Sequence, residues 1–206
     1  MKMTQKGASL LEVMVALLIM ALGLLGMAGL QAATSKFKVN TQAQTAVAQL
    51  VSEISEKIRV NPEAAGSSYD PTAAAQDSKY LLESDWKTQL EETISIDLNC
   101  ETNACTSDER AEFDMGTWRL RVRDTLPRGN ALLQGSRRDG FDVTLMWMDK
   151  EQTSDEENEE TGEKDRVLKK APVCQDGSEH TIVHNCCPAE ADAPEGVKCL
   201  RMSFLP

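Results

Sequence analysis

Residues 6–33 read KGASLLEVMVALLIMALGLLGMAGLQAA, and this stretch decides the fold. Glu12 is its single acid, and the next formal charge is Lys36. The uncharged run between them is about 23 residues long, which at about 1.5 Å per residue matches a hydrocarbon core about 30 Å thick. A carboxylate that faces lipid costs roughly 2.5–3.5 kcal/mol, so Glu12 is expected to have a partner. We therefore predict a membrane-spanning helix with a second environment in which Glu12 is paired.

A cleavable secretory signal is the alternative for this stretch. Ala32 and Ala33 follow Gln31 as a small-residue cleavage site would. Secretory signals have an apolar region of only about 7–15 residues, so the length of the run and the acid near its start argue against that reading. The three glycines within residues 23–29 fit either ordinary glycine of a membrane helix or the close approach of neighbouring helices.

The charges that flank the run predict its orientation only weakly. Lys2 and Lys6 precede it, whereas Lys36 and Lys38 follow it closely. The six cysteines of the remaining chain favour an oxidising compartment. Together these features predict a cytoplasmic N-terminus, one pass through the inner membrane and a periplasmic C-terminal domain.

The string from Lys6 to Leu17 resembles the class III signal of type IV pilins and of type II secretion pseudopilins. In that family an inner-membrane prepilin peptidase cuts after the glycine and methylates the new N-terminus. The resemblance implies a cut between Gly7 and Ala8 and methylation of Ala8. It also implies that Glu12 neutralises the N-terminal ammonium of a neighbouring subunit. Ala8 stands where phenylalanine is usual in the family.

Residues 22–31, LGLLGMAGLQ, resemble the PilV family of minor pilins more than major pilins, which tend to carry a proline in this region. The resemblance covers roughly the first 60 residues and is only architectural beyond them. It implies a pilin-like fold and incorporation at the pilus tip or initiation complex, which primes pilus assembly and serves twitching motility and adhesion. The implied partners are other minor pilins, the major pilin, the prepilin peptidase and the inner-membrane assembly platform. A minor pseudopilin of a type II secretion system and a membrane-anchored periplasmic binding protein remain as rivals.

An amphipathic stripe continues the helix beyond the apolar run. Its apolar members recur at spacings of three and four, namely Val39, Ala43, Val47, Leu50, Ile54 and Ile58. The pair Asn61-Pro62 is expected to end the helix. We predict one helix from about Ala8 to Val60, and four regions of the chain: a leader 1–7, a transmembrane or filament-core helix 8–33, the amphipathic half 34–60 and an α+β domain 61–206.

That domain is predicted to hold a short helix and an antiparallel sheet. Residues 61–79 have loop composition, and apolar residues recur every four positions across 78–94, which predicts a helix capped by Ser84 or Asp85. Alternating or apolar runs predict strands over 117–123, 141–148 and 197–204, with turns at Pro127, Gly129, Gly135 and Gly140 and a solvated acidic loop over 151–165. The fold class is therefore α+β and pilin-like, a long N-terminal helix packed on a small antiparallel sheet.

The six cysteines are predicted to form three disulfides. Cys100 and Cys105 are close enough in sequence to close a local loop. The other four are Cys174, Cys186, Cys187 and Cys199. Because a bridge between the adjacent cysteines would be strained, they pair either as 174–186 with 187–199 or as 174–187 with 186–199. Each set ties the C-terminal loop to the last strand, which resembles the disulfide-bounded C-terminal region of pilins.

No pattern in the chain predicts catalysis, a metal or a cofactor. His180 and His184 would share one face only on a helix, and the residues between them favour a strand. The acidic run 151–165 lacks the ligand spacing of a calcium loop. The formal net charge of −11 disfavours nucleic-acid binding, and loss of Lys2 and Lys6 with the leader makes the chain two units more negative. We expect a non-enzymatic membrane protein without cofactors.

Overall fold

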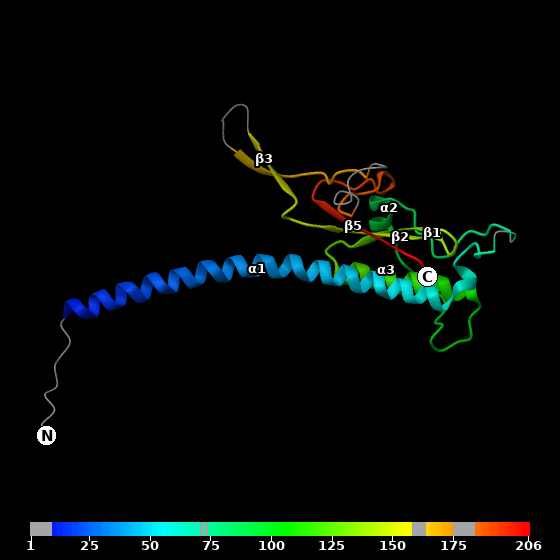
Figure 1. Cartoon of the computed structure of the whole chain (residues 1–206), viewed down its shortest axis with the longest axis horizontal. Helices are drawn as coiled ribbons and strands as arrows, with labels where there is room; N and C mark the ends of the chain where they lie inside the picture. The colour runs from blue at the N-terminus through cyan, green and yellow to red at the C-terminus, as the bar shows by residue number, and fades with distance from the viewer. Residues whose placement is uncertain (1–9, 71, 73, 158–163, 175–183) are drawn as a thin grey trace, which may run out of the picture. The chain divides into compact units, whose positions relative to one another are not determined.

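The computed structural model describes residues 10–70, 72, 74–157, 164–174 and 184–206. The chain divides into two compact units, of which the first ends at Thr45 and the second comprises Ala46–Pro206. We call the second unit the head. The boundary falls within the long helix α1 (Leu10–Val60), drawn from blue to cyan in Figure 1.

The predicted N-terminal helix is confirmed from Leu10 to Val60, while Ala8 and Ser9 lie outside the described residues. Within the head its buried side chains follow the helical spacing of the predicted stripe, namely Val47, Leu50, Val51, Ile54 and Ile58. The helix ends at the predicted place, because Pro62 begins the short 3-10 helix η1 (Pro62–Ala64).

The head contains a three-stranded antiparallel sheet with the strand order β1-β2-β5. Its strands are β1 (Asn130–Ser136), β2 (Gly140–Met148) and β5 (Val197–Phe204). In the register, Leu145 of the central strand lies opposite Ala131 on one side and Leu200 on the other. The predicted strands 141–148 and 197–204 are thus confirmed, and the last strand of the chain pairs with β2.

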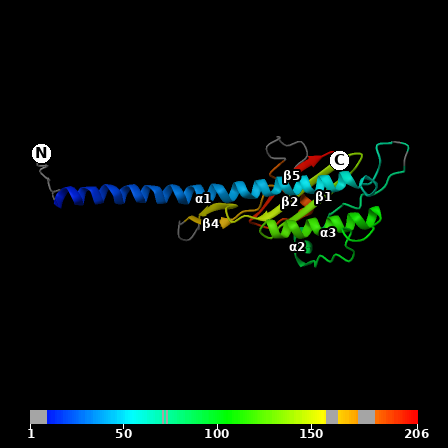
Figure 2. The same ribbon diagram turned by 90° about the horizontal axis from the view of Figure 1, so that it is seen from below.

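Helices cover one face of this sheet. The part of α1 that belongs to the head lies side by side with α3 (Ser107–Thr125), and both lie against the sheet in Figure 2. The indole Nε1 of buried Trp118 in α3 donates a hydrogen bond of 2.9 Å to the carbonyl of Leu50 in α1. This bond fixes the two helices to each other, because a buried indole N–H needs an acceptor.

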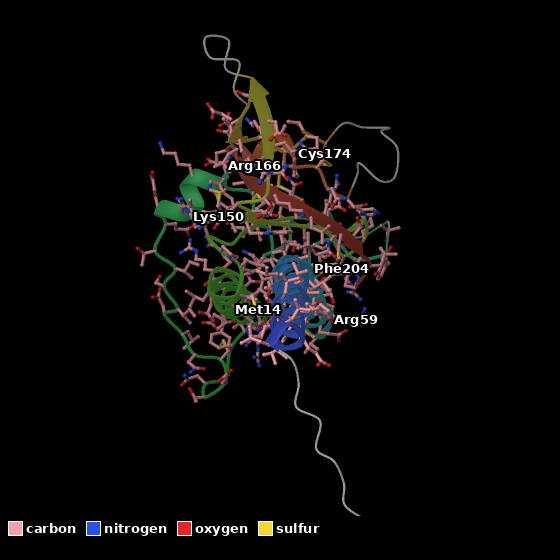
Figure 3. The ribbon with its side chains drawn as sticks, turned by 90° about the vertical axis from the view of Figure 1, so that its left-hand side faces the viewer. Met14, Arg59, Lys150, Arg166, Cys174 and Phe204 are labelled. Carbon is pink, nitrogen blue, oxygen red and sulfur yellow. A yellow bond between two sulfur atoms is a disulfide. The ribbon has the colours of Figure 1, made fainter. Side chains whose placement is uncertain are left out.

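The other face of the sheet is partly covered by α2 (Trp86–Glu91), as Figure 3 shows. The C-terminal segment, which includes the 3-10 helix η2 (Ala189–Ala191), covers it as well. A second apolar cluster forms there around Trp86, and its buried members include Leu132, Met146, Ala171, Cys187, Val197 and Cys199. The sheet is therefore buried on both faces over part of its length.

The strand predicted over 117–123 is wrong, because these residues belong to α3. Trp118 and Val122 are buried, but Leu120, the apolar residue between them, is 43% exposed. Buried Ala111 and Met115 extend the spacing of Trp118 and Val122 backward at intervals of four and three, which is helical. The short window 117–123 matched a period of two only because Arg119, Arg121 and Arg123 alternate with apolar residues in the sequence.

The helix predicted over 78–94 is confirmed only from Trp86 to Glu91. Asp85, one of the two predicted caps, accepts a hydrogen bond from the backbone N–H of Thr88. The preceding residues are extended, because the backbone of Leu82 exchanges two hydrogen bonds of 2.9 Å with Leu133 at the edge of β1. Pairing with the sheet edge thus outweighs the weak helical pattern before residue 85.

Strand β1 occupies a region that was predicted as turns only. Gly135 and Gly140 both have positive φ values, yet they lie inside the paired strands, next to the turn at 137–139. A Cβ at Gly135 would lie 2.1 Å from the carbonyl oxygen of Gly140, so this position needs glycine for close backbone approach. The glycines therefore mark the ends of a hairpin whose first strand was missed.

The acidic region 151–165 is not a plain loop. It contributes β3 (Thr153–Glu157) and the start of β4 (Lys164–Leu168), which pair with each other as a separate two-stranded sheet. Residues 158–163 lie outside the described residues. Cross-strand charge pairing helps to explain why so acidic a segment pairs, since Asp155 lies opposite Arg166.

Candidate assembly site

The first part of α1 is an apolar helix whose side chains meet no protein core. The stretch Leu10–Ser35 spans 26 residues with a mean hydropathy of 2.5, and its most apolar window has no buried residue. Leu10, Leu18 and Leu25 are 80%, 62% and 70% exposed. By length and composition this helix is suited to cross a membrane. Its apolar surface needs cover from lipid or from other helices.

Local chemistry explains how this helix holds together without a core. Every backbone group of a helix interior is bonded within the helix, which is the condition for crossing lipid. At the far end of the apolar stretch, the hydroxyls of Thr34 and Ser35 donate to the carbonyl of Gln31, at 3.0 and 2.9 Å, so they too have partners. Apart from the adjacent residues and the neighbouring backbone of the same helix, no described atom lies within 4 Å of the position that a Cβ would take at Gly23, Gly26 or Gly29. Both interpretations of these glycines therefore stay open.

Glu12 lies in the first turn of α1, where the helix dipole favours a negative charge, and its side chain is exposed. Its position one turn into an apolar helix is the geometry that the subunit-pairing hypothesis requires. Gly7 and Ala8, the predicted cleavage and methylation positions, lie outside the described residues. Their roles stay predictions.

The head anchors its part of α1 through a polar network. Lys57 Nζ lies 2.8 Å from Oδ1 of Asp114 in α3, and Asp114 is only 5% exposed. The hydroxyl of Tyr80 donates to Oδ2 of the same carboxylate at 3.4 Å, and Asn61 Nδ2 donates to the Tyr80 hydroxyl at 3.0 Å. Burial, offset in part by the bond from Asn61 and reinforced by the Asp114 charge, raises the pKa of Tyr80 to about 12. Tyr80 is therefore a neutral hydrogen-bonding link.

Sequence reasoning missed this network because it placed Asp114 before a strand. On α3, Asp114 stands beside Met115 and one turn before Trp118, on a face that is otherwise apolar. A lone acid on the buried face of a helix was the available signal, since such a group needs a partner. Lys57, next to Ile58 of the predicted stripe of α1, was the matching cation.

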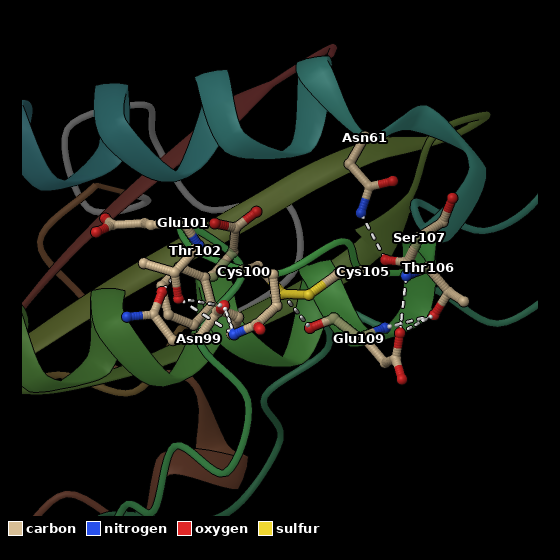
Figure 4. The surroundings of a disulfide bond; sticks show 12 residues. Asn61, Asn99, Cys100, Glu101, Thr102, Cys105, Thr106, Ser107 and Glu109 are labelled. Carbon is tan, nitrogen blue, oxygen red and sulfur yellow. Dashed lines mark hydrogen bonds between the residues drawn. A yellow bond between two sulfur atoms is a disulfide. The ribbon is translucent and has the colours of Figure 1, made fainter.

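Three disulfides join all six cysteines: Cys100–Cys105, Cys174–Cys186 and Cys187–Cys199. The first closes a loop that leads into the N-terminus of α3 (Figure 4). The other two are one of the two sets that the sequence left open. Cys187–Cys199 ties the C-terminal segment to β5 within the second apolar cluster. Cross-links of this kind supplement a core that is poor in aromatic residues.

The first of these disulfides adjoins the cap of α3. Thr106, directly after Cys105, accepts a hydrogen bond from the backbone N–H of Glu109, and the Glu109 carboxylate accepts one from the backbone N–H of Thr106. The backbone and hydroxyl bonds from Thr106 hold the pKa of Glu109 below its usual range. Helix α3 thus begins at a fixed point.

Within the described residues, no group of three His, Cys, Asp or Glu side chains is placed to hold a metal. His180 lies outside those residues, and His184 lies with its Nδ1 3.2 Å from the carbonyl of Arg201. The six sulfurs are all in disulfides and are not thiolate ligands. Residues 158–163 of the acidic run, which lacks the ligand spacing of a calcium loop, also lie outside the described residues.

A groove of about 500 Å³ lies within the head beside the end of α1 and the start of α3. Lys57 and Asp114 line it, but they already bond each other. Arg110 and Ser107 line the same groove, and the Ser107 hydroxyl donates to Glu63 at 2.8 Å. The groove is open to solvent.

Comparison with known proteins gives one match. The family model described as the prokaryotic N-terminal methylation motif matches residues 2–28. No curated protein and no solved structure matches the chain. The motif, followed by the apolar helix, supports a type IV pilin-like protein, that is, a pilin or pseudopilin processed by a prepilin peptidase. It also supports membrane anchoring of a C-terminal domain.

Proposed function

We propose that this chain is a minor pilin of the type IV pilus, of the PilV kind, that joins the pilus tip or initiation complex and primes pilus assembly. The observation that carries the proposal is the methylation motif over residues 2–28 on a helix whose apolar side chains have no core of their own. Cleavage between Gly7 and Ala8 and methylation of Ala8 would produce the mature N-terminus.

Assembly exchanges one apolar environment for another. In the inner membrane the helix contacts lipid, and in a fibre it packs among similar helices, so its apolar contact is kept in both places. Glu12 gains from the exchange, because a carboxylate facing lipid costs roughly 2.5–3.5 kcal/mol and an ammonium group of a neighbouring subunit would neutralise it. The transfer of the helix is thereby favoured without any chemical step at the head.

The proposed partners follow from this transfer. They are other minor pilins and the major pilin in the fibre, with the prepilin peptidase and the assembly platform in the inner membrane. The head would be periplasmic before assembly and on the cell surface afterwards, with roles in twitching motility and adhesion. Its three disulfides suit both places, because disulfides persist in oxidising compartments.

We propose a structural rather than an enzymatic role for the head. The buried polar groups described above serve to hold α1 and α3 together, and the groove beside them contains charges that already pair. In this proposal the head contributes an exposed protein surface to the fibre.

A minor pseudopilin of a type II secretion system is the second candidate, because the methylation motif serves both systems. The two roles separate by phenotype. Deletion of the gene should remove surface pili and twitching and leave secretion of exported enzymes unchanged. Loss of secretion with normal piliation would assign the chain to the secretion system instead.

Mass spectrometry of the protein recovered from membranes tests the processing. The expected N-terminal peptide begins at Ala8 and carries one methyl group on its amine. A Gly7→Val variant should keep the leader, whereas a Thr4→Val variant should be processed normally and serves as the control. An intact leader, or cleavage after Ala33, would favour a simple membrane anchor or a secretory signal.

A Glu12→Gln variant tests the pairing of the acid. It should insert in the membrane and be cleaved like the wild type but enter the fibre at least tenfold less, a change that corresponds to about 1.4 kcal/mol. Glu56→Gln is the matched control, since Glu56 is an exposed acid on the same helix beyond the apolar stretch. Immunoblots of sheared pili and of membranes measure both steps. Equal incorporation of the Glu12→Gln variant would refute the pairing role.

A further inference from the structure

The segment 93–98 lies between α2 and the Cys100–Cys105 disulfide, and it alternates as a β-strand does. Its sequence, TISIDL, places Ile94, Ile96 and Leu98 on one side and Thr93, Ser95 and Asp97 on the other. The structure bears this out in part. Thr93, Ser95 and Asp97 are exposed and Ile94 and Leu98 are partly buried, while Ile96 is 37% exposed. It is nevertheless part of no helix, strand or bridge.

Contacts at three points lay this segment along α3 in the opposite direction. At its start, Glu92 pairs with Arg119 of α3. In its middle, the Cγ1 of Ile96 lies 3.1 Å from a Cβ built at Gly116. Just beyond its end, the sulfur of Cys100 lies 3.7 Å from the carbonyl of Glu109, beside the disulfide shown in Figure 4. The segment is therefore fixed in place at both ends.

The backbone of this segment joins no hydrogen-bond ladder with the described residues. Within the part of the chain that the structure describes, no backbone-to-backbone hydrogen bond involves residues 93–98. The nearest such bonds lie at its borders, from Glu92 N–H to Thr88 and from Asn103 N–H to Asn99. A row of exposed, unpaired N–H and C=O groups is a template for strand pairing with another chain. Substitution of Gly116 would push Ile96 outward, so the glycine helps to keep this template flat on α3.

The charges around the segment select the kind of chain that would pair. Four exposed carboxylates line or border it, from Glu91, Asp97, Glu101 and Glu112, the last one turn before Gly116 on α3. Among the described residues, none of the four forms an ion pair. The nearby guanidinium groups of Arg119 and Arg123 already bond Glu92. The surface is thus acidic and unneutralised beside an open strand.

We propose that segment 93–98 is a docking strand for an extended polypeptide that carries Lys or Arg at alternate positions. The incoming chain pairs with the backbone of 93–98 as an antiparallel strand, and its basic side chains neutralise Asp97 and the flanking glutamates. Main-chain bonds supply the affinity, and alternate side chains supply the choice of partner. The proposal concerns a different surface from the apolar helix and does not depend on the role in a fibre.

Hydrogen exchange on the intact chain in detergent micelles tests the pairing. The probe is a synthetic peptide of alternating lysine and valine, and its controls are the same peptide with glutamate for lysine and with proline for every second valine. The lysine peptide should slow exchange of every second amide within 93–98, because only alternate N–H groups of a strand face one partner strand, and should leave the rest of the head unchanged. The glutamate peptide should bind at least tenfold more weakly, and so should the proline peptide, because proline lacks the N–H that a ladder needs.

Charge reversal on the chain itself provides the second test. Asp97→Lys should weaken binding of the lysine peptide about tenfold and strengthen binding of the glutamate peptide, as fluorescence anisotropy with labelled peptides would measure. Asp77→Lys is the matched control, since Asp77 is also exposed, lies in another loop and forms no ion pair with the described residues. Equal effects of the two variants would overturn the proposal. Equal binding of the proline peptide and the lysine peptide would also overturn it. So would protection of 93–98 that rises with protein concentration in the absence of peptide, because the occupant would then be a second copy of this chain.

Discussion

The two ends of α1 are both helical, but the apolar side chains of one end are exposed and those of the other are buried. Leu18 in the first unit is 62% exposed, whereas Ile54 in the head is fully buried. The first stretch is apolar on every side, and the second confines its buried residues to one stripe. Helix-forming residues therefore produce a helix in both, but the arrangement of apolar side chains decides what each contacts. An apolar stripe meets the protein's own core, while an apolar cylinder needs lipid or other subunits.

The tryptophans make this comparison measurable. All three of them, Trp86, Trp118 and Trp147, are buried in the head. Unfolding of the head can therefore be followed by tryptophan fluorescence in the full-length chain, without a signal from the apolar stretch. The chain stays in detergent micelles throughout, so that the first unit keeps an apolar environment.

The largest expected effect comes from Ile54→Ala. Loss of a fully buried isoleucine leaves a cavity between α1 and its neighbours in the head, and such changes cost about 2–5 kcal/mol. Leu18→Ala is the matched control and should leave unfolding of the head unchanged, because Leu18 touches no core. Denaturant titration followed by tryptophan fluorescence measures both. A loss of head stability in Leu18→Ala similar to that in Ile54→Ala would break the contrast between the two stretches.

The parts of the fold that could be predicted are those with one long, unambiguous period. The apolar run, the stripe from Val47 to Ile58 and the strands 141–148 and 197–204 all belong to this group. Residues 117–123 were misassigned because seven residues with alternating Arg and apolar side chains fit a strand as well as one side of a helix. The capping pair Thr106 and Glu109, which precedes this window on the same helix, was the decisive signal.

Long-range pairing explains the remaining errors. Leu82 leaves the predicted helix because it bonds the backbone of Leu133, and no local pattern reports that contact. Strand β1 was hidden by Gly135, which serves close backbone approach rather than a turn centre. The candidate assembly segment, in contrast, could be read from sequence alone, since its chemistry depends on consecutive residues and not on contacts with the rest of the chain.

A smaller effect is expected from Asp114→Ala, which tests whether the head also holds α1 by charge. The substitution removes the carboxylate that accepts from Lys57 and Tyr80. It leaves the Lys57 ammonium only the Thr117 hydroxyl at 3.5 Å, and the Tyr80 hydroxyl only the carbonyl of Lys57 at 3.4 Å. Removal of a partner from a charged hydrogen bond costs about 1.5–3 kcal/mol, and the lower part of this range applies because the Lys57 side chain is 23% exposed.

Asp108→Ala is the control for this variant. Asp108 pairs with Lys79 at 3.3 Å, but both side chains are more than half exposed, so the change should cost less than about 0.5 kcal/mol. The same fluorescence titration compares the two. If the variants proved equally stable, apolar contacts alone would hold the head's part of α1, and the Asp114 network would have no measurable share.

The smallest effect is expected from a substitution of Asp142. This residue should make the stability of the head depend on pH and leave the apolar stretch of α1 unaffected. Burial raises the pKa of Asp142, but the hydrogen bonds from Ser203 and Arg201 outweigh burial and hold it below its usual range. A carboxyl group with a lowered folded-state pKa stabilises the head above its ordinary pKa near 4, and this contribution is lost as the pH falls through the lowered value. Because the group is about a third exposed, the contribution should stay below about 1 kcal/mol. Asp142→Asn should therefore be less stable than the wild type at pH 6 and equal to it well below pH 4, as fluorescence titrations at each pH would show. The circular dichroism of the micelle-bound apolar helix should not differ between the two proteins at any pH, since the ion pair and hydrogen bonds of Asp142 with Arg201 and Ser203 lie within the head. A difference in head stability of equal size at every pH would mean that the carboxylate charge contributes nothing.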